Sequence, residues 1–404
     1  MADEVTPAEV ERAHDSIRPH VLRTPTVPAP RLGEPLGVRL WLKLENLQYT
    51  GSFKDRGSCY KLQGLAAAPQ PPAGVVAASA GNHAQGVAYH AGRLGIRATI
   101  VMPLTTPFSK VERTEGHGAT VELYGESVAE CAVHARELAA KHDLTFVHPY
   151  DDAMIVAGQG TCAKEMLEDV PELDTLVVPI GGGGLCAGTA LWAKHARPHV
   201  RVYGVQTERC PSMRAALRGE PAPKLFTHTL ADGIAVKTPG AIPKAILQSR
   251  IEDVLLVDEE AVETAVQMLA AQQKVVAEGA GAAGFAALLR HAELFRDRNV
   301  GVVVCGGNID RRLLSTVLLR GLKRDGKIAK LRITIHDVPG VLARVTQMIG
   351  AAGADVIDVE HQRLFNDLAP RDAQLDVVME TKGRAHVEKI LGALRDAGFP
   401  ADTV

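Results

Sequence analysis

Two different hydrophobic patterns divide the chain. Over the first four-fifths, short β-branched runs alternate with alanine-rich stretches whose apolar residues recur at helical spacing. This pattern predicts strands at 74–79, 98–103, 175–180, 201–205 and 300–305, and helices at 83–95 and 127–141. Strands that alternate with helices are typical of an α/β fold with parallel sheets, and continuous apolar strands fit sheets that are covered on both faces.

The pattern changes after the charged segment LKRDGK, residues 322–327. A strand is predicted at 331–337, followed by a helix at 339–353 that has an early proline and a closing glycine. Two more strands, a helix and a short last strand are predicted at 355–364, 373–381, 385–398 and 399–404. The order β-α-β-β-α-β indicates a small ferredoxin-like domain. We therefore predict one large domain over 1–322, a linker at 323–327 and a small domain over 328–404.

Composition excludes several classes of protein. The 404 residues are 46% hydrophobic and 23% charged, as in ordinary soluble proteins, and the net charge of -2 gives no reason to expect a nucleic-acid or anionic-membrane partner. The six cysteines form no C-x-x-C pair, which favours a reduced, cytoplasmic protein. The charged N-terminus is not a signal peptide, and Pro179 with four glycines interrupts the longest uncharged run, residues 175–193.

Two motifs place reactive or anion-binding groups at loops of the predicted α/β domain. Lys54 follows a Gly-Ser turn in SFKDRG, although a surface lysine paired with Asp55 is the simpler interpretation of that segment alone. The segment SAGNHAQG, residues 79–86, follows a strand and opens a helix, whose free N–H groups suit a carboxylate. An ordinary turn capped by Asn or Ser is its alternative.

Two glycine-rich segments follow later strands. In PIGGGGLCAG, residues 179–188, successive backbone N–H groups without side chains suit a phosphate, whereas a flexible turn is the alternative. No G-K-S/T follows, so this is not a common nucleotide loop. The segment VVVCGGNID, residues 302–310, is by itself a tight turn with Asn308 as a helix cap. A lysine, a phosphate site and a carboxylate site together suit a phosphorylated aldehyde cofactor that forms a Schiff base.

The motifs SFKDRG, SAGNHAQG, GGGGL and CGGN, in this order, resemble the fold-type II pyridoxal-phosphate family of threonine and serine dehydratases and serine racemases. Segments 148–161, 229–236 and 275–284 are also similar, so the resemblance covers about the first 320 residues. It implies two parallel-sheet α/β subdomains, the smaller one over about 47–150.

The resemblance also implies roles for individual residues. Lys54 carries pyridoxal 5'-phosphate as a Schiff base, and Asn82 bonds the ring hydroxyl. Further cofactor contacts fall on Phe53, Gly181, Gly182, Gly183, Gly184, Leu185 and Cys305, with the four glycines on the phosphate and Cys305 facing the ring nitrogen. The substrate carboxylate is surrounded by Ser79, Ala80, Gly81, Asn82 and His83.

Four positions depart from the family pattern. Cys305 stands where relatives usually have serine, and neither group is a strong acid, so the ring nitrogen is expected to stay unprotonated and to favour loss of a β-leaving group. Ala80 replaces the serine that racemases use as a second acid, so dehydration is expected to exceed racemization. Gln206 and Ser212 replace acidic ligands, so a divalent metal site is not expected there, and a monovalent ion is the alternative.

The implied reaction removes water and then ammonia from L-threonine or L-serine, giving 2-oxobutanoate or pyruvate. Its alternatives are a serine racemase, a β-replacing enzyme such as a cysteine or threonine synthase, and an amino-acid sensor without catalysis. The segment HDVPGVLARVTQMIGAAGADVIDVEHQR resembles an ACT domain. That resemblance implies paired domains in a homodimer or homotetramer and isoleucine or valine as effector, with a purely structural dimerisation module as the alternative.

Overall fold

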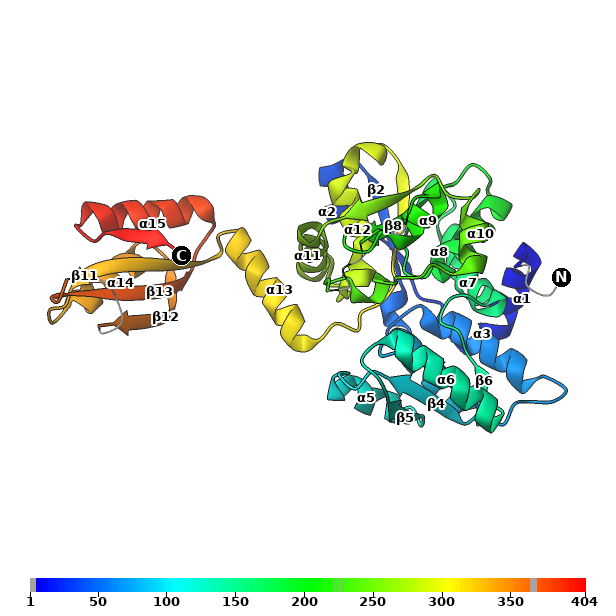
Figure 1. Cartoon of the computed structure of the whole chain (residues 1–404). Coiled ribbons are helices and arrows are strands. Elements are labelled where there is room, and N and C mark those ends of the chain that lie inside the picture. Colours follow the sequence, from blue (N-terminus) through cyan, green and yellow to red (C-terminus); the bar gives the residue numbers. More distant parts are fainter. Residues whose placement is uncertain (1–4, 222, 225, 227, 364–368) are drawn as a thin grey trace. The chain divides into compact units, whose positions relative to one another are not determined.

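The chain forms two compact units, Met1–Ile309 and Asp310–Val404 (Figure 1). The computed structural model describes residues 5–221, 223–224, 226, 228–363 and 369–404, so Leu364, at the end of a predicted strand, lies outside them. The division falls before α13 (Arg311–Arg324), which belongs to the second unit, whereas the change of sequence pattern suggested a boundary near Leu322. No helix in the described ranges is long and apolar enough to cross a membrane.

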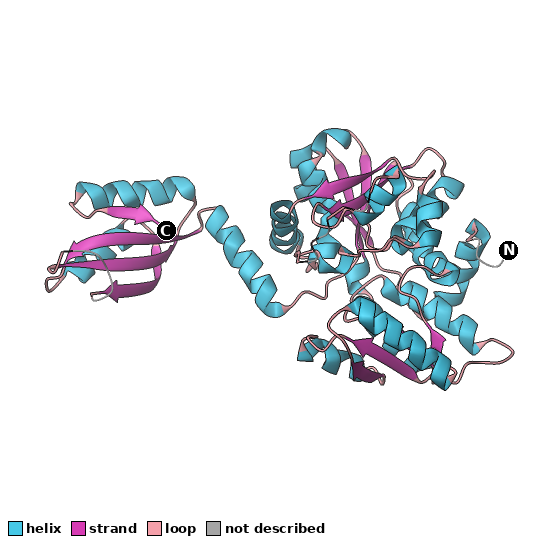
Figure 2. Ribbon diagram, viewed as in Figure 1, coloured by secondary structure: helices cyan, strands magenta, loops and turns pink. Residues whose placement is uncertain are grey.

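A six-stranded sheet forms the larger part of the first unit. Its order is β1-β2-β10-β7-β8-β9, in which β1 is antiparallel to β2 and all other neighbours are parallel. The strands are β1 (Thr26–Pro28), β2 (Arg39–Leu44), β7 (Thr175–Pro179), β8 (Arg201–Thr207), β9 (Asp253–Val257) and β10 (Asn299–Val304). Helices enclose the sheet (Figure 2), and β7 is buried at every residue, which confirms the prediction of covered parallel strands.

A second, four-stranded parallel sheet has the order β5-β4-β3-β6. Its strands are β3 (Val75–Ala78), β4 (Ala98–Met102), β5 (Thr120–Leu123) and β6 (Thr145–Phe146). The two predicted helices are present as α4 and α6. The hydroxyl of Ser127 accepts the Glu130 N–H at the start of α6, and Gly95 ends α4 at a φ of 68°.

The helices of the first unit have the following bounds: α1 (Pro7–Ile17), α2 (Pro30–Gly33), α3 (Lys54–Ala66), α4 (Asn82–Leu94), α5 (Phe108–Glu115), α6 (Val128–His142), α7 (Ala153–Asp169), α8 (Gly184–Ala196), α9 (Ser212–Arg218), α10 (Ala241–Leu247), α11 (Glu259–Met268) and α12 (Gly279–Arg290). Short helical turns lie at η1 (Glu34–Leu36), η2 (Glu45–Leu47), η3 (Asp232–Ile234), η4 (Leu269–Gln273) and η5 (Ala292–Leu294).

Helices α3 and α7 cross at a pair of glycines. A Cβ on Gly158 would lie 2.7 Å from the Cα of Gly57, and a Cβ on Gly57 would overlap the Gln159 amide. Because neither position has room for a side chain, the two helix backbones are in direct contact. This crossing sets the depth at which the start of α3 lies in the unit.

A buried ionic network locks the same two helices together. Arg56 on α3 donates to Glu45 at 2.7 and 2.8 Å and to Glu165 on α7 at 2.7 and 2.8 Å, and Lys43 also donates to Glu165 at 2.6 Å. All four side chains are almost fully buried. Burial alone would raise the pKa of Glu165, but Arg56 and Lys43 lower it below the ordinary value. Arg56 and Glu165 therefore stay ionised, and each charge depends on its partners.

The second unit contains an antiparallel sheet with the order β12-β13-β11-β14. Its elements after α13 are β11 (Ile328–His336), α14 (Val341–Ala351), β12 (Asp355–Gln362), β13 (Asp372–Glu380), α15 (Arg384–Asp396) and β14 (Ala401–Thr403). Alternate apolar residues of β11 and β13 share one core with both α14 and α15, so the two helices cover the same face. The predicted β-α-β-β-α-β order is confirmed.

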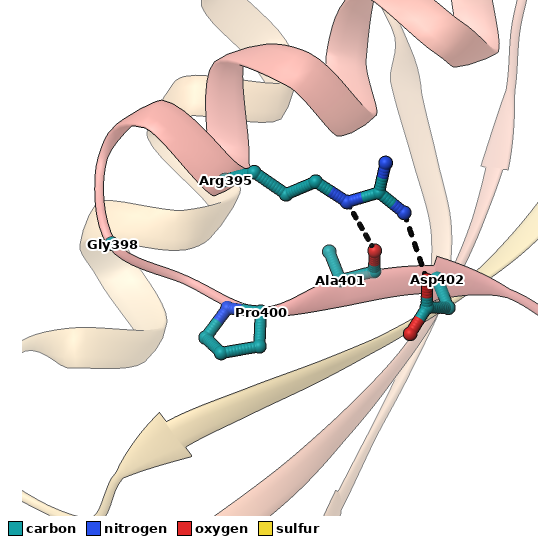
Figure 3. Close-up of a pocket in the computed structure, with 5 residues that line it drawn as sticks. All are labelled: Arg395, Gly398, Pro400, Ala401 and Asp402. Carbon is teal, nitrogen blue, oxygen red and sulfur yellow. Dashed lines mark hydrogen bonds and ion pairs between the residues drawn. The ribbon is translucent and has the colours of Figure 1, made fainter.

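A shallow hollow lies in this unit where the chain passes from α15 to β14 (Figure 3). Arg395 crosses it, donating through Nε to the carbonyl of Ala401 and through Nη2 to Asp402, both at 2.8 Å. Because these charged groups pair with each other, they hold β14 against α15 and do not form a ligand site.

Replacing Arg56 by methionine is expected to lower the free energy of unfolding of the first unit by about 3–5 kcal/mol, because Glu45 and Glu165 would stay buried without their main partner. Urea denaturation followed by circular dichroism measures the loss. The control is Arg23→Met, which removes partly exposed ion pairs to Glu168 and Asp169 and should cost at most about 1 kcal/mol. Equal losses in the two variants would contradict the assignment of the network as a structural lock.

Candidate active site

Lys54 is the first residue of α3, and its side chain is partly buried beside the loop that follows β6. Its Nζ donates a hydrogen bond of 2.7 Å to the carbonyl of Pro149. Burial lowers the pKa of the amine to about 8, against a smaller raising effect of Cys305. A neutral, nucleophilic amine is therefore accessible near neutral pH, unlike that of an ordinary exposed lysine. The alternative of a surface Lys54–Asp55 pair is wrong, since Asp55 is buried and bonded to Thr50.

The SAGNH segment runs from the end of β3 into the first turn of α4. Ser79, Ala80, Gly81 and Asn82 are all partly exposed, and no side chain in the described part of the chain caps the helix. The first N–H groups of a helix have no acceptor within it, so this turn can bind a carboxylate.

His83 is buried and neutral. Its Nε2 lies 3.0 Å from the carbonyl of Val147, which requires that nitrogen to carry the proton. Burial, reinforced by the charge of Lys54, lowers the pKa of His83 to about 3. The other nitrogen, Nδ1, has no hydrogen-bond partner among the residues that the structure describes. His83 can therefore accept a hydrogen bond here but is not a source of positive charge.

The four-glycine loop joins β7 to α8. Gly183 has a φ of 104°, and a Cβ on it would lie 2.6 Å from Met213 and 2.7 Å from Pro243. A Cβ on Gly182 would overlap the ring of Tyr150. Only glycine fits at these two positions, and the loop leads directly into the open N–H groups of α8, so it can hold a phosphate. Leu185, in the first turn of α8, is buried.

Cys305 directly follows β10 and is buried. Burial raises the pKa of its thiol well above the ordinary value, Glu278 adds to this rise, and Lys54 opposes it. The thiol is thus neutral. The backbone carbonyl of Cys305 accepts the Phe53 N–H at 3.0 Å, and Ser52 forms an isolated β-bridge with Gly306. These contacts bring the Lys54 segment and the CGGN segment together.

The sequence interpretation missed an amide–carboxylate network beside these groups. Asn82 Nδ2 donates to Glu278 at 2.7 Å, and Asn308 Nδ2 donates to Asn82 Oδ1 at 2.7 Å. Glu278 lies in segment 275–284, which resembled the family, but only its position in the fold reveals its partners. Tyr150 was missed in the same way, since its ring covers Gly182.

Gln206 and Ser212 stand at the positions where relatives are expected to have acidic metal ligands. Both side chains form hydrogen bonds within the protein. Gln206 Nε2 donates to Ser212 Oγ at 3.4 Å, and Ser212 donates to the carbonyl of Val236 at 2.6 Å. Across the described ranges, no three His, Cys, Asp or Glu side chains gather closely enough to hold a metal ion.

The groups brought together fit a phosphorylated aldehyde cofactor. A primary amine with a lowered pKa is required for a Schiff base, and Lys54 is such an amine. The phosphate requires backbone donors without obstructing side chains, which the loop at Gly181–Gly184 provides.

Comparison with known proteins agrees with this geometry. Residues 17–306 match the family model described as pyridoxal-phosphate dependent enzyme. The chain is 38% identical to an L-threonine ammonia-lyase of Geobacter sulfurreducens and 40% identical to one of Thermotoga maritima, each alignment covering 98% of both chains. The solved structure of serine racemase from Dictyostelium discoideum is 31% identical, with a TM-score of 0.71, and covers 76% of this chain and 99% of its own.

The matched region spans most of the chain and contains Lys54, the glycine loop and Cys305. The chain therefore belongs to the family of pyridoxal-phosphate-dependent enzymes.

Proposed function

We propose that this protein converts L-threonine to 2-oxobutanoate and ammonia, and L-serine to pyruvate and ammonia. The observation that carries the proposal is the Lys54 amine, whose pKa is lowered to about 8 beside an open helix start and a glycine loop. The full-length similarity to two L-threonine ammonia-lyases supports threonine as the preferred substrate class.

Different residues of the site would bind different parts of the cofactor. Lys54 would hold the aldehyde carbon, the N–H groups at Gly181–Gly184 would hold the phosphate, and Phe53, Leu185 and Cys305 would surround the ring. When bound, pyridoxal phosphate withdraws electrons from the α-carbon of an attached amino acid. Since the Cys305 thiol is neutral and far from losing its proton, it places no negative charge at the ring.

The chain's own groups then orient the substrate and move its proton. The first turn of α4, with Ser79 and Asn82, would bind the carboxylate, and His83 offers an acceptor nitrogen at the same place. Lys54, once freed as an amine, would take the α-proton. An amine with a pKa of about 8 is partly neutral at pH 7, so it can act as that base without a large energetic penalty.

Lys54→Ala is expected to lower kcat for threonine by at least about 10³-fold and to abolish the near-visible absorbance of the bound cofactor. A keto-acid assay and an absorbance spectrum measure the two effects. Lys61→Ala, on the same helix but paired with Asp152, is the control and should keep both activity and absorbance. An active, coloured Lys54→Ala protein would refute the proposed role.

Serine racemization is the second candidate function, because a serine racemase is among the similar solved structures. Ala80 argues against it. Its methyl group, at the open start of α4, cannot deliver a proton to the substrate, whereas a second acid is needed for inversion.

We expect D-serine to form from L-serine at less than about a hundredth of the rate of pyruvate, since a positioned acid contributes about 10²–10⁴-fold. Chiral chromatography after partial turnover measures the ratio. Ala80→Ser should raise D-serine formation by about tenfold or more, whereas the control Ala80→Gly should not. D-serine appearing as fast as pyruvate in the unaltered protein would contradict the prediction.

For the second unit, we propose an ACT domain that binds isoleucine or valine and pairs with a second copy in a homodimer or homotetramer. The support is the turn before α14, where Gly340 has a φ of 87°. Among the residues that the structure describes, no side chain caps this helix and no atom lies within 4 Å of where a Cβ on Gly340 would be. An open helix start of this kind can accept an amino-acid carboxylate.

Isoleucine or valine is expected to change the KM for threonine by about 5–150-fold, the usual range of coupling between two sites. Steady-state kinetics and melting temperatures of the full-length protein measure the effect. A chain truncated before Lys327 should remain active and ignore both amino acids. No response of the full-length protein to any common amino acid would leave assembly as the domain's role.

A further inference from the structure

The carboxyl group of Glu278 lies just before α12, within hydrogen-bonding distance of the residue expected to contact the cofactor ring. Glu278 as a residue is 7% exposed, and its Oε1 accepts from Asn82 Nδ2 at 2.7 Å. A Cβ on Gly306 would overlap that oxygen and lie 3.1 Å from Asn82 Nδ2. Glycine at 306 is therefore required for this pair to form.

The network determines which end of the Asn82 amide faces Glu278. Asn308 Nδ2 donates to the carbonyl of Thr50 at 2.7 Å, and Asn308 Oδ1 accepts from the guanidinium of Arg113 at 3.2 Å. A carbonyl only accepts and a guanidinium only donates, so the orientation of Asn308 is settled.

The orientation of Asn82 follows from that of Asn308. Since Asn308 Nδ2 also donates to Asn82 Oδ1, the amide nitrogen of Asn82 must face Glu278. One hydrogen of that nitrogen goes to the carboxylate and the other remains for a ligand acceptor.

We propose that Glu278 is a positioning residue: its carboxylate holds the Asn82 amide with one N–H free for the ring oxygen of the cofactor, and its protonation disturbs that arrangement. This inference rests on the proposed function, because it assumes that pyridoxal phosphate binds beside Lys54.

The groups around Glu278 place the pKa of its carboxyl group near neutral pH. Burial and then the carboxylate of Asp232 raise its pKa to about 7, whereas the hydrogen bonds from Asn82 and the Asn308 backbone, and the charge of Lys110, lower it. The thiol of Cys305, also close by, is neutral. Above pH 7 Glu278 is an acceptor for Asn82, and below pH 7 it gains a proton that competes with the hydrogen bonds it accepts.

The network also joins the two sheets of the first unit. Asn82 follows β3 of the four-stranded sheet, whereas Asn308 follows β10 of the six-stranded sheet and Glu278 precedes α12, which packs against it. A change in the ionisation of Glu278 therefore acts at the contact between them.

The test is a spectral pH titration of the holoenzyme between about pH 5.5 and 9, an interval that brackets the raised pKa of this buried carboxyl group. The kcat for threonine is measured over the same range. The unaltered protein should show a step near pH 7 in both. Glu278→Gln keeps an oxygen acceptor but cannot ionise, so it should lose the step. Glu278→Ala should weaken pyridoxal-phosphate binding by about tenfold, as expected for loss of a charged hydrogen-bond partner.

Two further variants keep the test decisive. Asp232→Asn should move the step to lower pH, because the neighbouring negative charge is removed, and Glu172→Gln, an exposed carboxylate, should leave it in place. A step that persists in Glu278→Gln, or does not move in Asp232→Asn, overturns the inference. If Glu278 had a purely structural role, its replacement would instead lower the melting temperature of the cofactor-free protein. The midpoint of the pH titration would then stay unchanged.

The proposed function has its own separate outcome. If the unaltered protein neither binds pyridoxal phosphate nor releases keto acid from threonine or serine, the proposed function fails. If it does both while Glu278→Gln retains the step, only the role of Glu278 fails.

Discussion

The buried guanidinium of Arg56 fixes the position of α3, and Lys54 lies half a turn before it on the same helix. Four hydrogen bonds to Glu45 and Glu165 tie Arg56 to the end of β2 and to α7, while the glycine contact at Gly57 removes any space between the two helices. A buried ion pair is costly to break, so the position of α3 against β2 and α7 is rigid. The reactive amine is therefore held at one depth relative to both sheets.

The candidate site is assembled from loops that the fixed position of α3 brings close to Lys54. The Lys54 segment touches the CGGN segment through Phe53 and Cys305, and the loop after β6 reaches Lys54 through Pro149 and the glycine loop through Tyr150. Each loop by itself is an ordinary turn. Together they form a place where an amine, open helix starts and a buried carboxyl group meet, as expected at the carboxyl ends of parallel strands.

Burial gives the site its electrostatic character. It lowers the pKa of Lys54 and His83 and raises the pKa of Cys305 and Glu278, so each group moves towards its neutral form. Two of these shifts, those of Lys54 and Glu278, end near neutral pH. These are the two groups whose protonation can change during turnover or with the pH of the medium.

The sequence by itself determined the types of element, the two kinds of sheet and the principal candidate residues. Strand and helix periods are local, so hydrophobic spacing located β3, β7 and β10, and the β-α-β-β-α-β order of the second unit. Gly182 and Gly183 could also be singled out, because four glycines follow a predicted strand. Lys54 was singled out only by its motif SFKDRG together with the other motifs that resemble the family. Only the tertiary structure decided which distant residues meet. Arg56 and Glu165, or Asn82 and Glu278, carry no local signal, because their partners lie more than a hundred residues away. Burial and pairing are properties of the packed chain, and they alone decide whether a carboxyl group is a solvated charge or a proton-holding group.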